Sequence, residues 1–323
     1  MTIILPPGLP AARKLRAEGV AVRHSQSAPL GAEPLRVLLI NLMPDKPVTE
    51  TQFARLLGGS RHPVELTLSV PDRHEWRHTD AGHIGRFYVP LRDALDGGPD
   101  ALVVTGAPVE TLAFEAVDYW PDIRDILDWA DRSVLPSMFV CWAAQAALYH
   151  RYGVPKRDLP CKRFGVYRHA LYGGTGLTAG LGYEMLMPVS RHTETRCADL
   201  PSDAGLRVSA ASAEAGIGLV EDSGRHAAYL FNHPEYDPIT LAAEYVRDLA
   251  AGRSQAPPEN CSLEPDPGGT CAWRTSARRL YANWLDQAAR HRDVRRKTRR
   301  TVGPRPAAAA IGLLRHVSGT GCT

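Results

Sequence analysis

The 323-residue sequence is poor in cysteine and has no long apolar segment. Its six cysteines form no CxxC pair and no zinc-finger spacing, so we expect neither a disulfide scaffold nor a bound metal. No apolar run approaches the roughly 20 residues that a membrane span requires. The first ten residues also lack the basic segment and apolar core of a secretory signal. These absences predict a cytoplasmic protein with no membrane partner.

The chain also has little net charge. The net charge is only +3, and residues 290–323 account for the excess with nine Lys or Arg and one acidic residue. The remaining body is mildly acidic, so we expect no nucleic-acid partner. Residues 291–323 are basic and then rich in alanine, a composition that predicts a disordered tail.

Apolar runs alternate with amphipathic segments along the body of the chain. Leu35–Leu42 is almost continuously apolar, as in a strand buried on both faces of a parallel sheet. Further strands are predicted at Val64–Val70, Ala101–Thr105, Leu135–Val140, Leu206–Ala211 and His226–Phe231, and helices at Val117–Arg132, Trp142–Tyr152 and Pro238–Ala251. This alternation predicts an α/β fold with a mostly parallel sheet over residues 35–290. Residues 1–34 are interpreted as an N-terminal arm with one short helix, and residues 156–205 show no regular pattern.

The first chemical motif is a cysteine where a predicted strand meets a predicted helix. Cys141 follows the strand and directly precedes Trp142. In a parallel sheet this junction lies at the carboxyl edge, where ligands bind. The helix N-terminus favours a thiolate, and its N–H groups can stabilise an oxyanion. From this segment alone, a buried structural cysteine is an equally good interpretation.

The second motif is His233 followed two residues later by Glu235, at the end of another predicted strand. In an extended segment both side chains point to one side, and a carboxylate orients a neighbouring imidazole and raises its basicity. A solvated turn is the ordinary alternative. Because a cysteine nucleophile needs a base, the two motifs together favour a Cys–His–Glu triad on an α/β scaffold.

Six longer segments of the sequence, two of which contain these motifs, show a family resemblance. They are VLLINLMPDKPVTETQ (37–52), VTGAPVETLAFE (104–115), VDYWPDI (117–123), FVCWAAQAAL (139–148), YGVPKR (152–157) and HPEYDPITLAAEYVRD (233–248). Together they resemble the homoserine O-acyltransferase family of the homoserine O-succinyltransferase type, a relative of class I glutamine amidotransferases. The resemblance implies a flavodoxin-like fold with helices on both faces of a mostly parallel sheet, an acyltransferase catalytic domain over residues 35–290, and a homodimer.

The resemblance also implies roles for individual residues. Cys141 would carry the acyl group as a thioester, and His233 would be the general base, oriented by Glu235. The implied substrate contacts are Lys162, Ser190 and Arg247. The reaction would join an acyl group from acyl-CoA to the hydroxyl of L-homoserine for methionine biosynthesis, with acyl-CoA as co-substrate and no cofactor.

The glutamate at position 110 implies acetyl-CoA as the donor, because glycine at this position accompanies succinyl-CoA in the family. The physical reason agrees, since a carboxylate beside the acyl pocket would repel the free carboxylate of a succinyl group. Lys46, in the loop after the first strand, is a candidate contact for a CoA phosphate. The backbone N–H groups of Trp142 and Leu42 are candidates for an oxyanion hole.

Several positions depart from the family pattern, and one of them, Val189, leaves the acceptor open. Asp45 stands where a small polar or basic residue is common, and Val189 replaces the usual histidine before Ser190. L-Serine, one methylene shorter than homoserine, is therefore an alternative acceptor, because a pocket discriminates one methylene by only ~1–3 kcal/mol. Succinyl-CoA is the alternative donor. A cysteine amidotransferase or hydrolase is the second alternative, although Trp142 and Ala143 replace the small, glycine-rich elbow of glutaminases.

Overall fold

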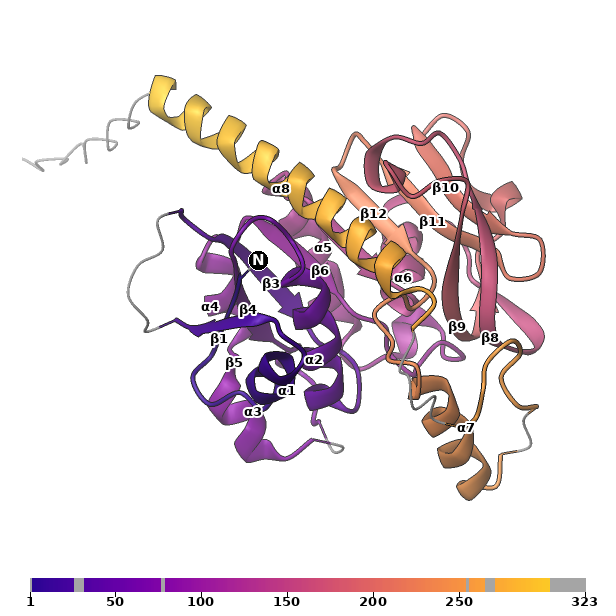
Figure 1. Ribbon diagram of the computed structural model, residues 1–323. Coiled ribbons are helices and arrows are strands. Elements are labelled where there is room, and N and C mark those ends of the chain that lie inside the picture. The colour runs from indigo at the N-terminus through magenta and orange to yellow at the C-terminus, as the bar shows by residue number, and fades with distance from the viewer. Residues whose placement is uncertain (1, 26–31, 77–78, 254–255, 265–270, 303–323) are drawn as a thin grey trace, which may run out of the picture.

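The computed structural model describes residues 2–25, 32–76, 79–253, 256–264 and 271–302 (Figure 1). The strands are β1 (Thr2–Leu5), β2 (Ala21–His24), β3 (Leu35–Ile40), β4 (Val64–Ser69), β5 (Tyr88–Val89), β6 (Ala101–Val104), β7 (Ser137–Val140), β8 (Arg157–Leu171), β9 (Glu184–Glu194), β10 (Leu206–Ser212), β11 (Gly216–Asp222) and β12 (Ala227–Leu230). The helices are α1 (Ala11–Ala17), α2 (Lys46–Leu57), α3 (Ala81–Phe87), α4 (Leu91–Asp96), α5 (Trp120–Arg132), α6 (Trp142–Tyr152), α7 (Thr240–Ala250) and α8 (Arg274–Val302).

All strands in the described residues belong to one sheet. Its order is β2-β1-β4-β3-β6-β7-β12-β11-β10-β8-β9, and β5 pairs with β4. Neighbours from β2 to β12 are parallel, whereas those from β12 to β9 are antiparallel. The predicted mostly parallel α/β sheet is confirmed, and the antiparallel strands extend it on one side (Figure 1).

Helices cover both faces of the parallel strands, as predicted. Along β3, Val37 and Leu39 belong to one apolar core, which includes residues of α1, α2 and α8. Leu38 and Ile40 belong to a second core, with residues of α4, α5 and α6. Because successive side chains of a strand point to opposite faces, a continuously apolar strand such as β3 requires cover on both sides.

The N-terminal segment differs from the predicted arm. Its short helix is present as α1, but the residues on either side of it form β1 and β2. These two strands pair in parallel with each other, and β1 pairs with β4, so residues 2–24 extend the main sheet. Strands of four residues carry too short a pattern to be distinguished from an arm in the sequence.

Residues 156–205 also differ from the sequence-based expectation. They contain the long antiparallel hairpin of β8 and β9, with Phe164 paired with Ser190 and a register irregularity between Asp158 and Arg163. Gly165, with φ +153°, lies against the backbone of Glu259, which a side chain at this position would displace. The irregularity and this glycine interrupt the alternation by which a strand is recognised.

The prediction of disorder from residue 291 is wrong for residues 291–302, which continue α8. The first half of α8 packs Ala277, Leu280, Trp284 and Leu285 into the core against α1 and α2. Arg292 then donates to the carbonyl of Pro34 at 3.2 Å, and Arg296 pairs with Glu33. Tertiary contacts therefore extend the helix into the basic segment. The rest of the predicted tail, residues 303–323, lies outside the described residues.

Two aspartates that precede helices have different roles. The side chain of Asp45 caps α2 by accepting the N–H of Val48 at 3.2 Å, which gives this departure from the family pattern a structural role. Asp237, which precedes α7, accepts from Arg55 at 2.6 Å and Arg274 at 2.9 Å. It therefore joins α7 to α2 and α8. Within the described part of the chain, no helix has the length and apolar character to span a bilayer.

Candidate active site

Cys141 occupies the turn between β7 and α6, as the sequence predicts. Its φ of 52° and ψ of −113° are unusual for a residue with a side chain, and it is the N-cap residue of α6. Its N–H donates to the carbonyl of Leu230 at 2.7 Å, which joins the end of β7 to the end of β12. A strained backbone held between a strand and a helix fixes the direction of the thiol at the carboxyl edge of the sheet.

Gly106, two residues after β6, shows that the two predicted motifs meet. A Cβ built on this glycine would lie 3.2 Å from the Cβ of Cys141 and 3.3 Å from Cε1 of His233. The thiol and the imidazole therefore border the same small space, although they lie far apart in the sequence. A side chain at position 106 would fill this space, so glycine keeps it open.

His233 and Glu235 form a buried pair after β12. The imidazole Nδ1 donates to Oε1 of Glu235 at 2.6 Å, and both residues are almost completely buried. The His233 N–H donates to the carbonyl of Pro188 at 2.8 Å, and the ring of Tyr236 stacks on the imidazole with centroids 4.3 Å apart. Backbone, carboxylate and aromatic ring together hold the imidazole in one orientation.

The charges around His233 favour its protonated form. Burial by itself would lower the pKa of the imidazole, but the carboxylate of Glu235 and the charge and hydrogen bond of Cys141 outweigh it and raise this pKa well above the ordinary value. A group that gains a proton so readily can take one from a thiol or a hydroxyl. The pair is thus suited to generate a thiolate at Cys141.

Arg191, in β9, is a second buried cation near the thiol. It donates to Oδ1 of Asn232 at 2.5 Å and to the carbonyl of Ala215. Burial lowers its pKa to about 10, while the negative charges of Cys141 and Glu194 act in the opposite direction. Arg191 remains charged at neutral pH and therefore adds a fixed positive charge near the thiol.

The three predicted substrate contacts converge on one carboxylate, that of Glu244 in α7. Lys162 Nζ and Ser190 Oγ each lie 2.6 Å from its Oε1, and Arg247 Nη2 lies 3.9 Å from the same oxygen. Asp248 contributes a second carboxylate, 3.1 Å from both Lys162 and Arg247. β8, β9 and α7 thus build a polar cluster that contains charges of both signs.

Tyr236 connects this cluster to the triad. Burial raises the pKa of its phenol, and the negative charges of Glu244, Glu235 and Cys141 raise it further. The Tyr236 ring stacks on the imidazole of His233 and packs in one apolar cluster with Phe164, over which the ammonium group of Lys162 lies. The polar cluster and the thiol therefore belong to one site.

Glu110 lies in the same loop as Gly106, four residues further along the chain. Its backbone carbonyl accepts a hydrogen bond from Lys156 Nζ. Burial lowers the pKa of Lys156, and the carboxylate of Glu110 opposes that shift. Glu110 thus lies in the loop that borders the thiol, and its carboxylate interacts with the partly buried ammonium group of Lys156.

One predicted oxyanion donor is excluded by the structure. The Leu42 N–H already donates to Oγ1 of Thr105 at 2.8 Å, and the Met43 N–H to Oδ1 of Asn41 at 3.1 Å. The other predicted donor, Trp142, is the first residue of α6, where an N–H has no intrahelical acceptor. Gly106 and Ala107 offer two further N–H groups, for which the described residues supply no acceptor.

Lys46 is not the surface lysine that the sequence suggested. It is fully buried at the first position of α2 and donates to the carbonyls of Asn41 at 3.0 Å and Met43 at 3.1 Å. Its ammonium group lies 3.5 Å from the centre of the Trp76 ring. A side chain enclosed in this way does not reach a phosphate at the surface, so the structure contradicts the predicted CoA contact.

Burial instead makes Lys46 a pH-sensitive element of stability. It lowers the pKa of Lys46 from 10.5 to about 7, opposed by the charge of Glu50. Between these values the unfolded chain binds more protons than the folded one, so this lysine adds stability as pH rises from 7 towards 10.5.

We expect Lys46→Met to remove this contribution. From about pH 7 to about pH 9, the wild type should gain on the order of 2 kcal/mol of unfolding free energy relative to the variant. Urea unfolding at both pH values measures the difference. Lys14→Met, at a position that is 55% exposed, serves as the control and should follow the wild type. Equal pH dependence in wild type and Lys46→Met would contradict a buried, readily deprotonated Lys46.

Comparison with known proteins agrees with this arrangement. Residues 2–293 match the family described as homoserine O-succinyltransferase. The chain belongs to the homoserine O-succinyltransferase family. Membership makes the protein an acyltransferase.

Curated relatives share much of the sequence of this family member. A homoserine O-acetyltransferase of a Synechococcus species is 44% identical over 290 residues, which cover 88% of this chain and 97% of the relative. A homoserine O-acetyltransferase of Brucella canis is 42% identical over 291 residues, covering 89% of this chain and 95% of the relative. The matched region contains the triad, the polar cluster and Glu110.

Solved structures resemble this family member in fold. A glutamine amidotransferase from Methylobacillus flagellatus aligns with a TM-score of 0.54 at 13% identity, over 79% of this chain and 95% of the other. A glutamine amidotransferase from Thermotoga maritima aligns with a TM-score of 0.50 at 12% identity, over 80% and 99% of the two chains. The predicted class I glutamine amidotransferase-like fold is thereby confirmed.

Sequence reasoning did not identify three residues of this site: Gly106, Arg191 and Glu244. Gly106 ends the run VVTG, where a glycine after a buried strand is a signal of close backbone approach. Glu244 carries no comparable signal, because nothing in the sequence shows that Lys162 and Ser190 approach the same carboxylate. Among the described residues, no group of three or more His, Cys, Asp or Glu side chains could hold a metal ion.

Proposed function

We propose that this acyltransferase moves the acetyl group of acetyl-CoA to the hydroxyl of L-homoserine through a thioester on Cys141. The convergence of Cys141 and the His233–Glu235 pair on Gly106, beside the polar cluster around Glu244, carries this proposal. A nucleophile with its base lies at the centre, and a recognition site for an amino acid lies next to it.

In the first half-reaction, the Cys141 thiolate attacks the thioester carbonyl of acetyl-CoA. The proton of the thiol passes to His233, whose imidazolium is stabilised by Glu235. The tetrahedral oxyanion is held by the N–H of Trp142 and an N–H of the Gly106–Ala107 segment, in place of Leu42. The bond to the CoA sulfur then breaks, and His233 returns the proton to the leaving thiolate. The product is acetyl-Cys141 and CoA.

In the second half-reaction, His233 takes the proton from the hydroxyl of homoserine. The oxygen attacks the thioester carbonyl, and the bond to Sγ of Cys141 breaks as O-acetyl-L-homoserine forms. The enzyme returns to its thiolate–imidazolium pair. No cofactor or metal enters either step, and acetyl-CoA is consumed as a co-substrate.

The polar cluster suits an α-amino acid, which carries both charges. Glu244, whose contacts with Lys162, Ser190 and Arg247 all involve Oε1, can accept an ammonium group through Oε2, and Arg247, which is 62% exposed, can turn its guanidinium towards a carboxylate. Val189, which raised L-serine as the alternative acceptor, packs in the core with Tyr167 and Ala215. Adjacent strand residues point to opposite faces, so Val189 and Ser190 do not face the same pocket. This placement favours homoserine.

The donor is best tested by comparing acetyl-CoA and succinyl-CoA, each with homoserine and with serine. We expect the wild type to prefer acetyl-CoA and homoserine. Glu110→Gly should raise the succinyl-to-acetyl ratio of kcat/KM at least about tenfold, because it removes a repelling carboxylate and frees space. Steady-state assays of CoA release measure this ratio.

Glu115→Gly, which removes an exposed carboxylate from the neighbouring turn, is the matched control and should leave the ratio unchanged. A wild-type preference for succinyl-CoA would overturn the donor assignment. A preference for serine would overturn the acceptor assignment while leaving the acyl-thioester chemistry intact.

The alternative of a cysteine amidotransferase shares the scaffold and the triad. Trp142, however, is fully buried and packs against Phe114 and Tyr119, so the segment after the nucleophile lacks a small, open elbow. Release of ammonia from glutamine without acyl-CoA would support this alternative. The cytoplasmic location and the homodimer stay predictions.

A further inference from the structure

A large cavity lies at the edge of the sheet opposite the active site. It has a volume of about 720 Å³ and is bordered by α8, β11 and the start of β12. His226, which lines it, directly precedes β12 and accepts the N–H of Ser137 at 3.0 Å, whereas Leu230 at the other end of β12 accepts the N–H of Cys141. The cavity and the thiol are therefore separated by the length of a four-residue strand, roughly 13 Å.

The acidic groups of this cavity are already occupied. Glu221 accepts from Arg207 at 2.8 Å and from Ser209 at 2.6 Å. Asp222 accepts from the hydroxyls of Tyr152 at 2.5 Å and Tyr229 at 3.2 Å. With their oxygens bonded within the protein, these carboxylates are poor partners for a cationic ligand.

Two ring nitrogens of residues in the cavity lining, in contrast, lack hydrogen-bond partners. Nε1 of Trp284 and Nδ1 of His291 are buried, and the described residues provide no hydrogen-bond partner for either atom. Arg290, exposed at the rim, has no ion pair within the described part of the chain. Among the described residues, the lining thus keeps one guanidinium group without an ion pair, while its two carboxylates are bonded within the protein.

Two imidazoles, those of His226 and His291, also line the cavity. The rings of His226 and His291 lie 4.7 Å apart. Burial lowers the pKa of His291, and the positive charges of His226 and Arg295 lower it further. His226 also has a φ of 53°, a conformation that costs free energy in a residue with a side chain. An anion bound beside both rings can accept hydrogen bonds from their accessible N–H groups.

We propose that this cavity is a binding site for a small organic anion, separate from the acyl-transfer site. A carboxylate or phosphate group of the ligand is held by Arg290 and the imidazoles of His226 and His291. Guanidinium groups bind both carboxylates and phosphates through paired hydrogen bonds. These residues therefore indicate an anionic ligand without distinguishing between the two groups.

The test is calorimetric titration of the full-length protein in Tris chloride, with citrate as the carboxylate probe and glycerol 3-phosphate as the phosphate probe. We expect one-site binding of at least one probe with a Kd below about 1 mM. Arg290→Glu and, independently, His291→Gln should each weaken it at least about tenfold. The probe that binds more tightly identifies the chemical source of the anion.

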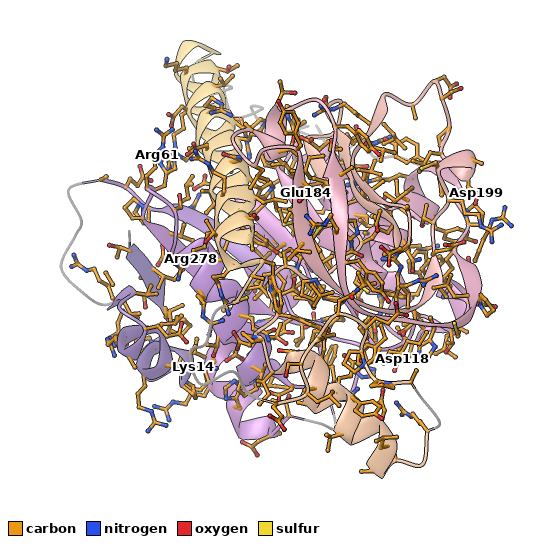
Figure 2. The ribbon with its side chains drawn as sticks, turned by 45° about the vertical axis from the view of Figure 1, so that its right-hand side comes forward. Lys14, Arg61, Asp118, Glu184, Asp199 and Arg278 are labelled. Carbon is orange, nitrogen blue, oxygen red and sulfur yellow. The ribbon has the colours of Figure 1, made fainter. Side chains whose placement is uncertain are left out.

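Arg278→Glu is the matched control, because it reverses one charge on the same helix at a different groove, which Arg61 also lines (Figure 2). It should leave the Kd unchanged. Acyl-transfer activity of each variant confirms that the protein is folded, since none of these residues contacts the triad. Absence of saturable binding for both probes would overturn the proposal, and so would binding that Arg290→Glu and His291→Gln leave intact.

Discussion

Replacing Cys141 by alanine is expected to lower kcat/KM for acyl transfer by about a thousandfold or more. The variant loses the nucleophile, so the acyl group has no covalent route from CoA to the acceptor. Gly106 and His233 retain their places, and binding of acetyl-CoA should persist. CoA release in the presence of homoserine measures the loss.

Intact-protein mass spectrometry gives the same prediction a second readout. Mixed with acetyl-CoA alone, the wild type should gain one acetyl group, and peptide mapping should place it on Cys141. Cys161→Ala, at an exposed position of β8, is the control and should keep both the adduct and full activity. An active Cys141→Ala enzyme, or an adduct on another cysteine, would exclude the proposed mechanism.

Replacing Glu235 by glutamine should lower kcat by about a hundredfold to ten-thousandfold. The amide can still accept the hydrogen bond from Nδ1 of His233, but it no longer carries the charge that stabilises the imidazolium. With that charge removed, the pKa of His233 falls, and the thiolate–imidazolium pair becomes less favourable. The pH profile of kcat/KM should shift with the loss of rate.

Glu214→Gln provides the comparison, because Glu214 is an exposed carboxylate in the turn before β11. It should change neither rate nor pH profile. Thermal unfolding of both variants separates chemistry from stability: a glutamine at position 235 that lowers the melting temperature but leaves the pH profile unchanged would assign Glu235 a purely structural role.

The sequence predicted most accurately the strands and helices whose apolar residues form one continuous, buried run. β3, β6, β7 and α6 form where the apolar runs predict them, because local pattern and tertiary burial agree there. β8 and β9 were missed because a long antiparallel pairing depends on a partner tens of residues away. The extension of α8 through residue 302 was missed because it depends on contacts with Glu33 and Pro34, not on its own composition.

The site shows the same division. Cys141, His233 and Glu235 could be named in advance, because a cysteine at a strand–helix junction and a His-x-Glu after a strand carry their chemistry in local order. Leu42 and Lys46 were assigned wrongly, since only the fold shows that one N–H is taken by Thr105 and that the ammonium group is buried. Glu244 was underrated because its partners come from three separate elements.

By itself, the sequence determined the α/β class, the strand–helix junction that holds Cys141 and the candidate triad, because each is encoded in a few consecutive residues. Only the tertiary structure decided that Gly106 lies between thiol and imidazole, that Glu244 collects the predicted substrate contacts, and that a cavity lies at the far end of β12. The physical reason is that burial, and with it pKa and hydrogen-bond satisfaction, depends on which distant segments pack together.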